Sequence, residues 1–379
     1  MTTKETTQYL CNIAKEINNI TGNLYDEILS LYQNDADSPI LPYLRDTSKY
    51  LREQEAFAQY CQYDDQIFGQ MCFLSQALSL WREDKILYSF DEDMEEILVS
   101  QSLDANQDDP LPIDVLNALP YSSFFIKTAH TPYRPNMGLH HLDKNNMPPE
   151  LREVADRLSK MEAVGFFVNR ELSKVNEKMT EVIGFTTVLS HRETGQLKIA
   201  SHIIPLCCRT LAEAVEIEIA DSQEALDEEM RMNETGRKRA FNLLYQQFSE
   251  ALQLLLYLCV KNKEEKQDEE NAVIYRKASS PRFSKFKPRE VKELVLGSET
   301  GSLIRTLKKN QDTIKYIGAD STNHTGKTKA PHPRAGHYHH YWIGKGRKEL
   351  VLKWVAPTFV NKHLSAQYDS TIIHVENNK

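Results

Sequence analysis

The hydrophobic pattern of this chain changes its period partway along, and that change constrains the fold more than any other feature. Up to about residue 118, apolar residues recur every three or four positions, as at Leu10, Ile13 and Ile17. This spacing is typical of amphipathic helices. We expect helices over residues 10–31, 64–81 and 91–99. After residue 118, short runs rich in β-branched and aromatic residues alternate with turn signals, a pattern that predicts strands.

The strand-like runs lie at residues 124–126, 163–168, 181–189 and 197–206. These runs are short and are separated by turn signals such as Thr194-Gly195, a pattern that suits an antiparallel sheet. Two helices are expected after them, over residues 210–219 and 233–260, and the leucines of the second must pack against a partner surface. A charged run over residues 261–271 predicts a linker. Beyond it we expect a helix at residues 288–295 and strands at residues 337–343, 349–355 and 370–375.

Together these patterns predict an α+β protein in three parts, and 379 residues leave room for them. The first part, residues 1–118, is a helical N-terminal region. The second, residues 119–265, is a central antiparallel sheet packed with helices. The third, residues 266–379, is a basic, β-rich C-terminal module.

The formal charge of −8 conceals an uneven distribution along the chain. Residues 276–362 carry 19 Lys and Arg against 6 Asp and Glu, whereas residues 1–275 carry 26 against 46. A basic segment joined to an acidic body favours a polyanionic partner such as nucleic acid.

The same sequence favours a cytoplasmic protein that binds neither membrane nor cofactor. Six cysteines in a chain of this length, most of them within apolar runs, indicate reduced thiols rather than a disulfide framework. The N-terminus lacks the apolar stretch of a signal peptide. The longest apolar run is about half as long as a membrane span requires.

The densest cluster of chemically active residues lies at residues 331–347, and six of the twelve histidines fall between His324 and His363. If residues 337–343 form a strand, its two-residue period directs His337, His339 and Tyr341 to one face. Tyr338, His340 and Trp342 then take the other face, where we expect Tyr338 and Trp342 to help fill a small core. Three cations flank the strand: Arg334, Lys345 and Arg347.

Three kinds of chemistry fit this cluster. In the first, Arg334, Lys345, Arg347 and Lys353 neutralise phosphates while Tyr341 stacks on unpaired bases. In the second, His337 and His339 act as base and acid in metal-independent RNA cleavage, with Arg334 on the phosphate. The third, a metal site on the same two histidines, is the weakest, because no cysteine and only one carboxylate, Glu349, lie nearby. We therefore expect no metal.

The C-terminal run resembles the second-numbered type V-A anti-CRISPR protein family of phages, plasmids and other mobile elements. The residues that carry the resemblance are Pro331-His332, Arg334, Gly336-His337-Tyr338-His339, Tyr341-Trp342, Gly344, Gly346, Lys353-Trp354 and Pro357-Thr358-Phe359-Val360-Asn361. Gly336, Trp342, Gly344, Gly346, Trp354 and Asn361 belong to this motif as structural residues. Ala335 departs from the pattern, because an arginine is usual there and its loss removes a phosphate donor.

The resemblance implies an inhibitor that recognises the nascent N-terminal peptide of the type V-A CRISPR effector nuclease and triggers destruction of its mRNA. Its partners would be that peptide and either RNA or the translating ribosome. Two alternatives stay open from the residues alone: a metal-independent ribonuclease, and a DNA-binding regulator of a mobile element.

Overall fold

The computed structural model describes twelve stretches of the chain. They are residues 3–34, 65–101, 107–128, 161–176, 178–191, 197–224, 233–268, 291–306, 332–334, 336–346, 348–355 and 358–360.

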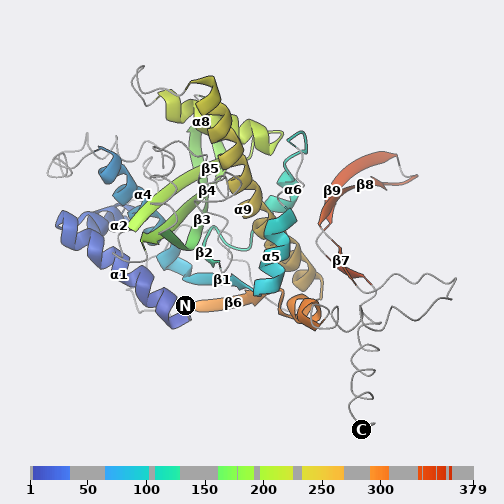
Figure 1. Cartoon of the computed structure of the whole chain (residues 1–379), viewed down its shortest axis with the longest axis horizontal. Coiled ribbons are helices and arrows are strands. Elements are labelled where there is room, and N and C mark those ends of the chain that lie inside the picture. The colour runs from blue at the N-terminus through green and yellow to red at the C-terminus, as the bar shows by residue number, and fades with distance from the viewer. Residues whose placement is uncertain are drawn as a thin grey trace, which may run out of the picture.

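A six-stranded sheet forms the centre of the molecule, with the strand order β5-β4-β3-β2-β1-β6 (Figure 1). The strands are β1 (Ile86–Phe90), β2 (Ser123–Lys127), β3 (Met161–Val175), β4 (Lys178–His191), β5 (Leu197–Pro205) and β6 (Lys292–Leu296). Strands β2 to β5 pair antiparallel, whereas β1 pairs parallel with both β2 and β6. The sheet as a whole is therefore mixed.

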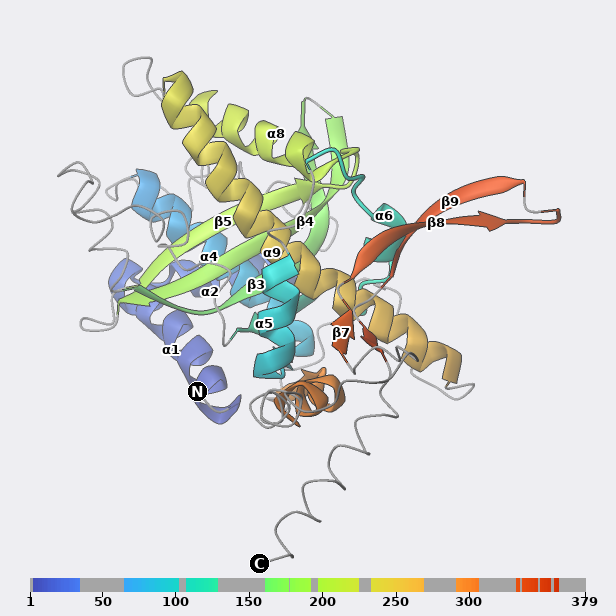
Figure 2. The same cartoon turned by 45° about the vertical axis from the view of Figure 1, so that its right-hand side comes forward.

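Helices cover both faces of this sheet (Figure 2). One face packs against α1 (Thr3–Thr21), α2 (Leu24–Asn34) and α4 (Asp65–Asp84). The other packs against α5 (Glu92–Ser100), α6 (Ile113–Leu116), α8 (Leu211–Glu224) and α9 (Glu234–Asp268). The result is a three-layer arrangement with a hydrophobic core on each side of the sheet.

The alternation of side chains along β2 and β3 explains the two cores. Phe124 and Phe166 lie in the core beneath α9, whereas Phe125 and Phe167 lie in the core beneath α4, and all four side chains are fully buried. Successive residues of a strand point to opposite faces, so a continuous apolar run is what a strand covered on both sides requires.

Two short ribbons follow the sheet along the chain. Strand β7 (His332–Arg334) pairs antiparallel with β10 (Thr358–Val360), and β8 (His337–Ile343) pairs antiparallel with β9 (Glu349–Val355). Figures 1 and 2 both show the β8–β9 hairpin extending away from the helices and the central sheet.

The predicted α+β class is confirmed, with helices at the N-terminus and four antiparallel strands close to the predicted positions. The bounds predicted for the last hairpin, residues 337–343 and 349–355, are those of β8 and β9. The predicted strand at residues 370–375 lies outside the described residues. The division into parts at residues 118 and 265 stays a prediction, although β1 and β6, from the first and third parts, both join the central sheet.

Two predictions in the C-terminal half are wrong. Residues 292–296 form strand β6 rather than a helix, because Leu294 and Leu296 alternate onto the core while the backbone pairs with β1. The linker expected over residues 261–271 is wrong for residues 261–268, because α9 continues to Asp268. Lysine and glutamate are good helix formers, and Asn262 fixes this extension by donating to the carbonyl oxygen of Ala118 at 2.9 Å.

Within the described residues, no helix combines the length and the apolar character that crossing a membrane requires.

Candidate nucleic-acid interface on the C-terminal hairpin

Two glycines shape the turn of the β8–β9 hairpin. The seven paired positions run from His337 opposite Val355 to Ile343 opposite Glu349. Gly344 and Gly346 then adopt φ values of 81° and 82°, a left-handed conformation that disfavours other residues. The turn therefore presents Lys345 between two glycines, and its side chain is exposed.

In the described part of the chain, Trp354 and Gly336 fasten the base of the hairpin to the body. Trp354, opposite Tyr338 in the register, is only 5% exposed and belongs to the core beneath α9. The backbone N–H of Gly336 donates to Oε1 of Gln101 at 3.0 Å. Gln101 is the C-cap of α5 and is itself buried. Gln101 was missed by the sequence reasoning, since a glutamine at a helix end carries no motif.

The outer end of the hairpin is exposed. Tyr341 is 40% exposed and Trp342 is 58% exposed, and Lys345 and Lys348 are exposed beside them. The expectation that Trp342 fills a small core is wrong, because this end of β8 extends beyond the body. Exposed aromatic rings next to ammonium groups can stack on bases while the cations approach phosphates.

The other predicted site residues fall into three groups. Arg334 is exposed on β7, where its backbone lies opposite Thr358. His337 and His339 are two residues apart on β8, and the register sets His339 opposite Lys353. Arg347 and Asn361 lie outside the described residues. Tyr341, Trp342 and Lys345 therefore lie together at the outer end, while Gly336, His337 and Trp354 lie at the base.

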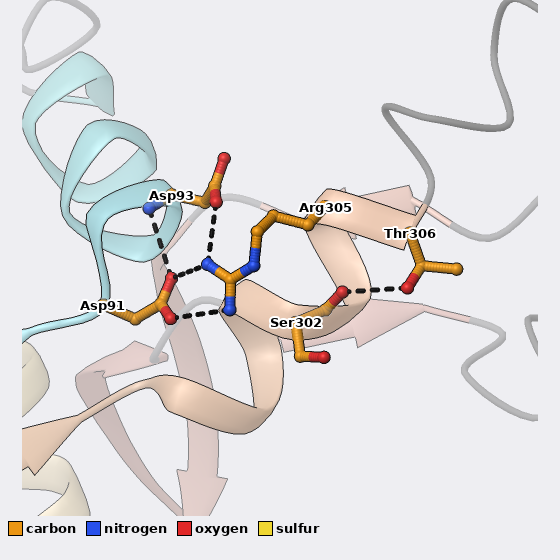
Figure 3. A network of polar contacts seen from close by, with 5 residues as sticks. All are labelled: Asp91, Asp93, Ser302, Arg305 and Thr306. Carbon is orange, nitrogen blue, oxygen red and sulfur yellow. Dashed lines mark hydrogen bonds and ion pairs between the residues drawn. The ribbon is translucent and has the colours of Figure 1, made fainter.

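A second polar cluster joins α5 to the helix at residues 298–306 (Figure 3). Both terminal guanidinium nitrogens of Arg305 donate to the Asp91 carboxylate, at 2.8 and 2.9 Å, and one also donates to Asp93 at 2.9 Å. These hydrogen bonds, above all those to Asp91, raise the pKa of Arg305. The Asp91 side chain also accepts from the backbone N–H of Asp93 and so caps α5.

This ion-pair cluster is a structural clamp. Gly301 lies so close to the Asp91 carboxylate that a Cβ would collide with it. The Arg305 guanidinium binds both carboxylates, and Asp91 also caps the start of α5. These contacts hold the two helices together. Across the described residues, no group of three His, Cys, Asp or Glu side chains could hold a metal ion.

Comparison with known proteins gives a matching family and similar solved structures, one of which is described below. The family described as "AcrVA2-like: Anti-CRISPR type V subtype A2 family" matches residues 88–362, a span that runs from β1 to just beyond β10. A solved structure described as "Crystal structure of AcrVA2" is similar with a TM-score of 0.45 and 15% sequence identity. The similarity covers 92% of this chain and 97% of that chain. No curated protein sequence matches the chain.

Proposed function

The chain belongs to the AcrVA2-like family, the anti-CRISPR type V subtype A2 family, and from this membership we propose that it lowers production of a type V-A CRISPR effector nuclease. In this proposal the protein, encoded by a phage or plasmid, recognises the nascent N-terminal peptide of the nuclease in the cytoplasm and triggers degradation of the mRNA. Its C-terminal hairpin binds that RNA or the translating ribosome.

The observation that carries the RNA-binding part is the exposed outer end of the hairpin. Burying a tryptophan is strongly favourable, so a Trp342 that is 58% exposed gives up stabilisation that the fold could have used. Lys345 and Lys348 lie in the same turn region, and all three residues belong to the basic segment of residues 276–362. A positively charged surface with an exposed aromatic ring is what single-stranded nucleic acid binds.

The test measures target mRNA in bacteria that express the nuclease together with wild-type protein or the double variant Tyr341→Ala, Trp342→Ala. We expect the message to fall with wild type and to stay near its uninhibited abundance with the variant. Ile20→Ala is the matched control, because Ile20 on α1 is also an exposed apolar residue, at 52%. A double variant that lowers the message as well as wild type would contradict the proposed role of the hairpin.

The peptide part of the proposal is tested by recoding the first codons of the nuclease. Synonymous codons change the RNA and keep the peptide, so we expect the message to be lost as before. Codon changes that alter the peptide with few nucleotide changes should instead protect the message. If message loss follows the nucleotides and ignores the peptide, recognition of the nascent chain is wrong.

A metal-independent ribonuclease is the second candidate, because strand β8 carries His337 and His339 two residues apart. Two histidines can act as the base and the acid of RNA cleavage. Purified protein should then cut labelled RNA in EDTA. If RNA stays intact there and host extract restores cleavage, the protein recruits a nuclease instead. Tighter binding to duplex DNA than to single-stranded RNA would favour a regulator and contradict both candidates.

A further inference from the structure

Two buried polar side chains on one face of β3 hold three atoms that lack a hydrogen-bond partner. Oδ1 of Asn169 accepts from the hydroxyl of Ser123 at 2.8 Å, but its Nδ2 is buried and unpaired. Glu171 lies two residues further along, and both of its carboxyl oxygens are buried and unpaired although the residue as a whole is partly exposed. The large majority of buried polar side-chain atoms in proteins are hydrogen-bonded, so these three unpaired atoms require an explanation.

Within the described part of the chain, no charged side chain pairs with the Glu171 carboxyl. Burial alone raises its pKa well above the ordinary value. The adjacent cation, Arg170, points to the opposite face of the strand and is engaged there. It donates to Glu181 at 2.9 Å and to Oδ1 of Asn117 at 3.0 Å.

The three unpaired atoms define what a ligand must offer. The Glu171 oxygens can accept hydrogen bonds, and Asn169 Nδ2 can donate one. The two residues are about 7 Å apart along the strand. A ligand that fits both therefore carries donors at one end and a carbonyl-type acceptor roughly one peptide unit away.

The free amino terminus of a peptide has this pattern. Its ammonium group donates up to three hydrogen bonds, and the carbonyl groups of its first residues lie beside it. A lysine ammonium lacks such a neighbouring acceptor, so it would satisfy Glu171 and leave Asn169 unpaired.

Apolar residues adjoin the polar pair. Val182 lies directly opposite Glu171 on β4, and it forms a small buried cluster with Val175 and Ile203. These three side chains are at most 4% exposed, so an apolar first side chain, such as the methionine with which translation begins, could pack against them only after the site has opened.

We propose that Asn169 and Glu171 bind the free amino terminus of a peptide, with the ammonium group on Glu171 and a backbone carbonyl on Asn169. This inference rests on the proposed function, because it gives a place on β3 to the recognition of the nascent N-terminus. The oxygens are buried in the free chain, so the site must open for entry, and we expect association slower than about 10⁵ M⁻¹s⁻¹.

The test titrates purified full-length protein with two synthetic peptides that carry the first residues of the type V-A effector nuclease. One peptide has a free amino terminus and the other is N-acetylated. We expect the free peptide to bind about ten- to a hundredfold more tightly, the size of a charge-assisted hydrogen bond. Glu171→Gln keeps the shape and removes the charge, so it should abolish this preference.

Glu181→Gln is the matched control. It is the same substitution on the neighbouring strand β4, but the Glu181 carboxylate already pairs with Arg170. We expect it to retain the preference. Thermal unfolding should show Glu171→Gln at least as stable as wild type, since the variant removes an unpaired buried carboxyl. Equal affinity of wild type for the two peptides, or a preference retained in Glu171→Gln, would overturn the inference.

The same experiment separates this inference from the proposed function. If the preference for the free peptide depends on Glu171 but the protein leaves the target mRNA untouched, the site is supported and the proposed function is contradicted. Message loss that is intact in Glu171→Gln, together with unchanged peptide binding, supports the proposed function and contradicts the site.

Discussion

The central sheet and the β8–β9 hairpin use their aromatic side chains in opposite ways. In the sheet, Phe124, Phe125, Phe166 and Phe167 are fully buried, on both faces. In the hairpin, Trp342 is 58% exposed. Burial of apolar area holds the sheet together, whereas the outer end of the hairpin contributes little to folding and is available for a partner.

The two regions also differ in how they are fixed. An isolated two-stranded hairpin is marginally stable in water. Among the described residues, buried Trp354 and the hydrogen bond from Gly336 to Gln101 stabilise the base of this hairpin. The hairpin is thus an arm held at one end. Changes in the sheet and at the base should lower stability, and changes at the outer end should alter binding only.

The largest effect is expected from Gly165→Ala in β3. A Cβ there would collide with the carbonyl oxygen of Ile126 and would lie 2.6 Å from Cζ of Phe125. Backbone and a fully buried ring cannot yield easily, so we expect a loss on the order of 5 kcal/mol, or no folded protein. Urea unfolding measures it.

Gly346→Ala in the hairpin turn is the matched control for that substitution. Among the described residues, its Cβ would meet only side-chain atoms of Lys348, at 3.7 and 3.9 Å, which is ordinary contact, so we expect the cost to come from the positive φ. We expect about 1 kcal/mol. Similar losses for the two glycine variants would contradict the division between a tightly packed sheet and an open arm.

The next largest effect concerns a buried carboxyl of the body. Glu250 on α9 is fully buried, and burial raises its pKa to about 8, although a hydrogen bond from Gln246 opposes the shift. A carboxyl whose pKa is higher in the folded state than in the unfolded state destabilises the fold when it is ionised. Its cost is absent below the ordinary pKa of 4.5 and grows as the pH rises to about 8.

Glu250→Gln removes that titration. We expect the variant to match wild type near pH 4.5 and to exceed it by on the order of 4 kcal/mol at pH 8, in urea unfolding measured across this range. Glu216→Gln is the control, since Glu216 is half-exposed and pairs with Arg237 on the surface. A stability difference between Glu250→Gln and wild type that does not vary with pH would show that Glu250 is not buried in the charged form.

Trp354→Ala should cost about 3 kcal/mol, because the side chain is buried in the core beneath α9. The loss should also release the hairpin, so limited proteolysis should cut residues 336–355 faster in this variant. A hairpin that stays protected after Trp354 is removed would show that another contact holds the base.

The elements that the sequence predicts well are those with strong local signals. Strands β8 and β9 are rich in aromatic and β-branched residues and are separated by a turn with two glycines, Gly344 and Gly346, so their bounds were predicted correctly. Strand β6 was missed because Lys292, Glu293 and Leu294 form helices readily, and only pairing with a strand about 200 residues earlier decides their structure.

The site is harder to predict than the fold, because burial is a property of the tertiary structure. A tryptophan in a β-rich run is usually buried, yet Trp342 is exposed because the arm extends past the body. Glutamate is almost never fully buried without a partner, so no sequence pattern singles out the carboxyl of Glu171. The residues that we propose for binding are those whose local preference and actual surroundings disagree.

The smallest effect on stability, and the sharpest test of the comparison, comes from Trp342→Ala. With its ring exposed, we expect a change in stability within about 0.5 kcal/mol. Its affinity for single-stranded RNA should nevertheless fall about tenfold, since one lost stacking contact is worth about 1–3 kcal/mol. Fluorescence anisotropy with labelled RNA over a range of salt concentrations measures both affinity and salt dependence.

Salt dependence distinguishes the ring from the cations. Stacking releases no counterions, so Trp342→Ala should leave the slope of log affinity against log salt unchanged. Lys345→Ala should reduce that slope by about one, if the ammonium contacts a phosphate. If both variants bind RNA as wild type does, the exposed end of the hairpin serves a partner other than nucleic acid. If Trp342→Ala instead destabilises the fold as Trp354→Ala does, the outer end is part of the core and the comparison between sheet and arm fails.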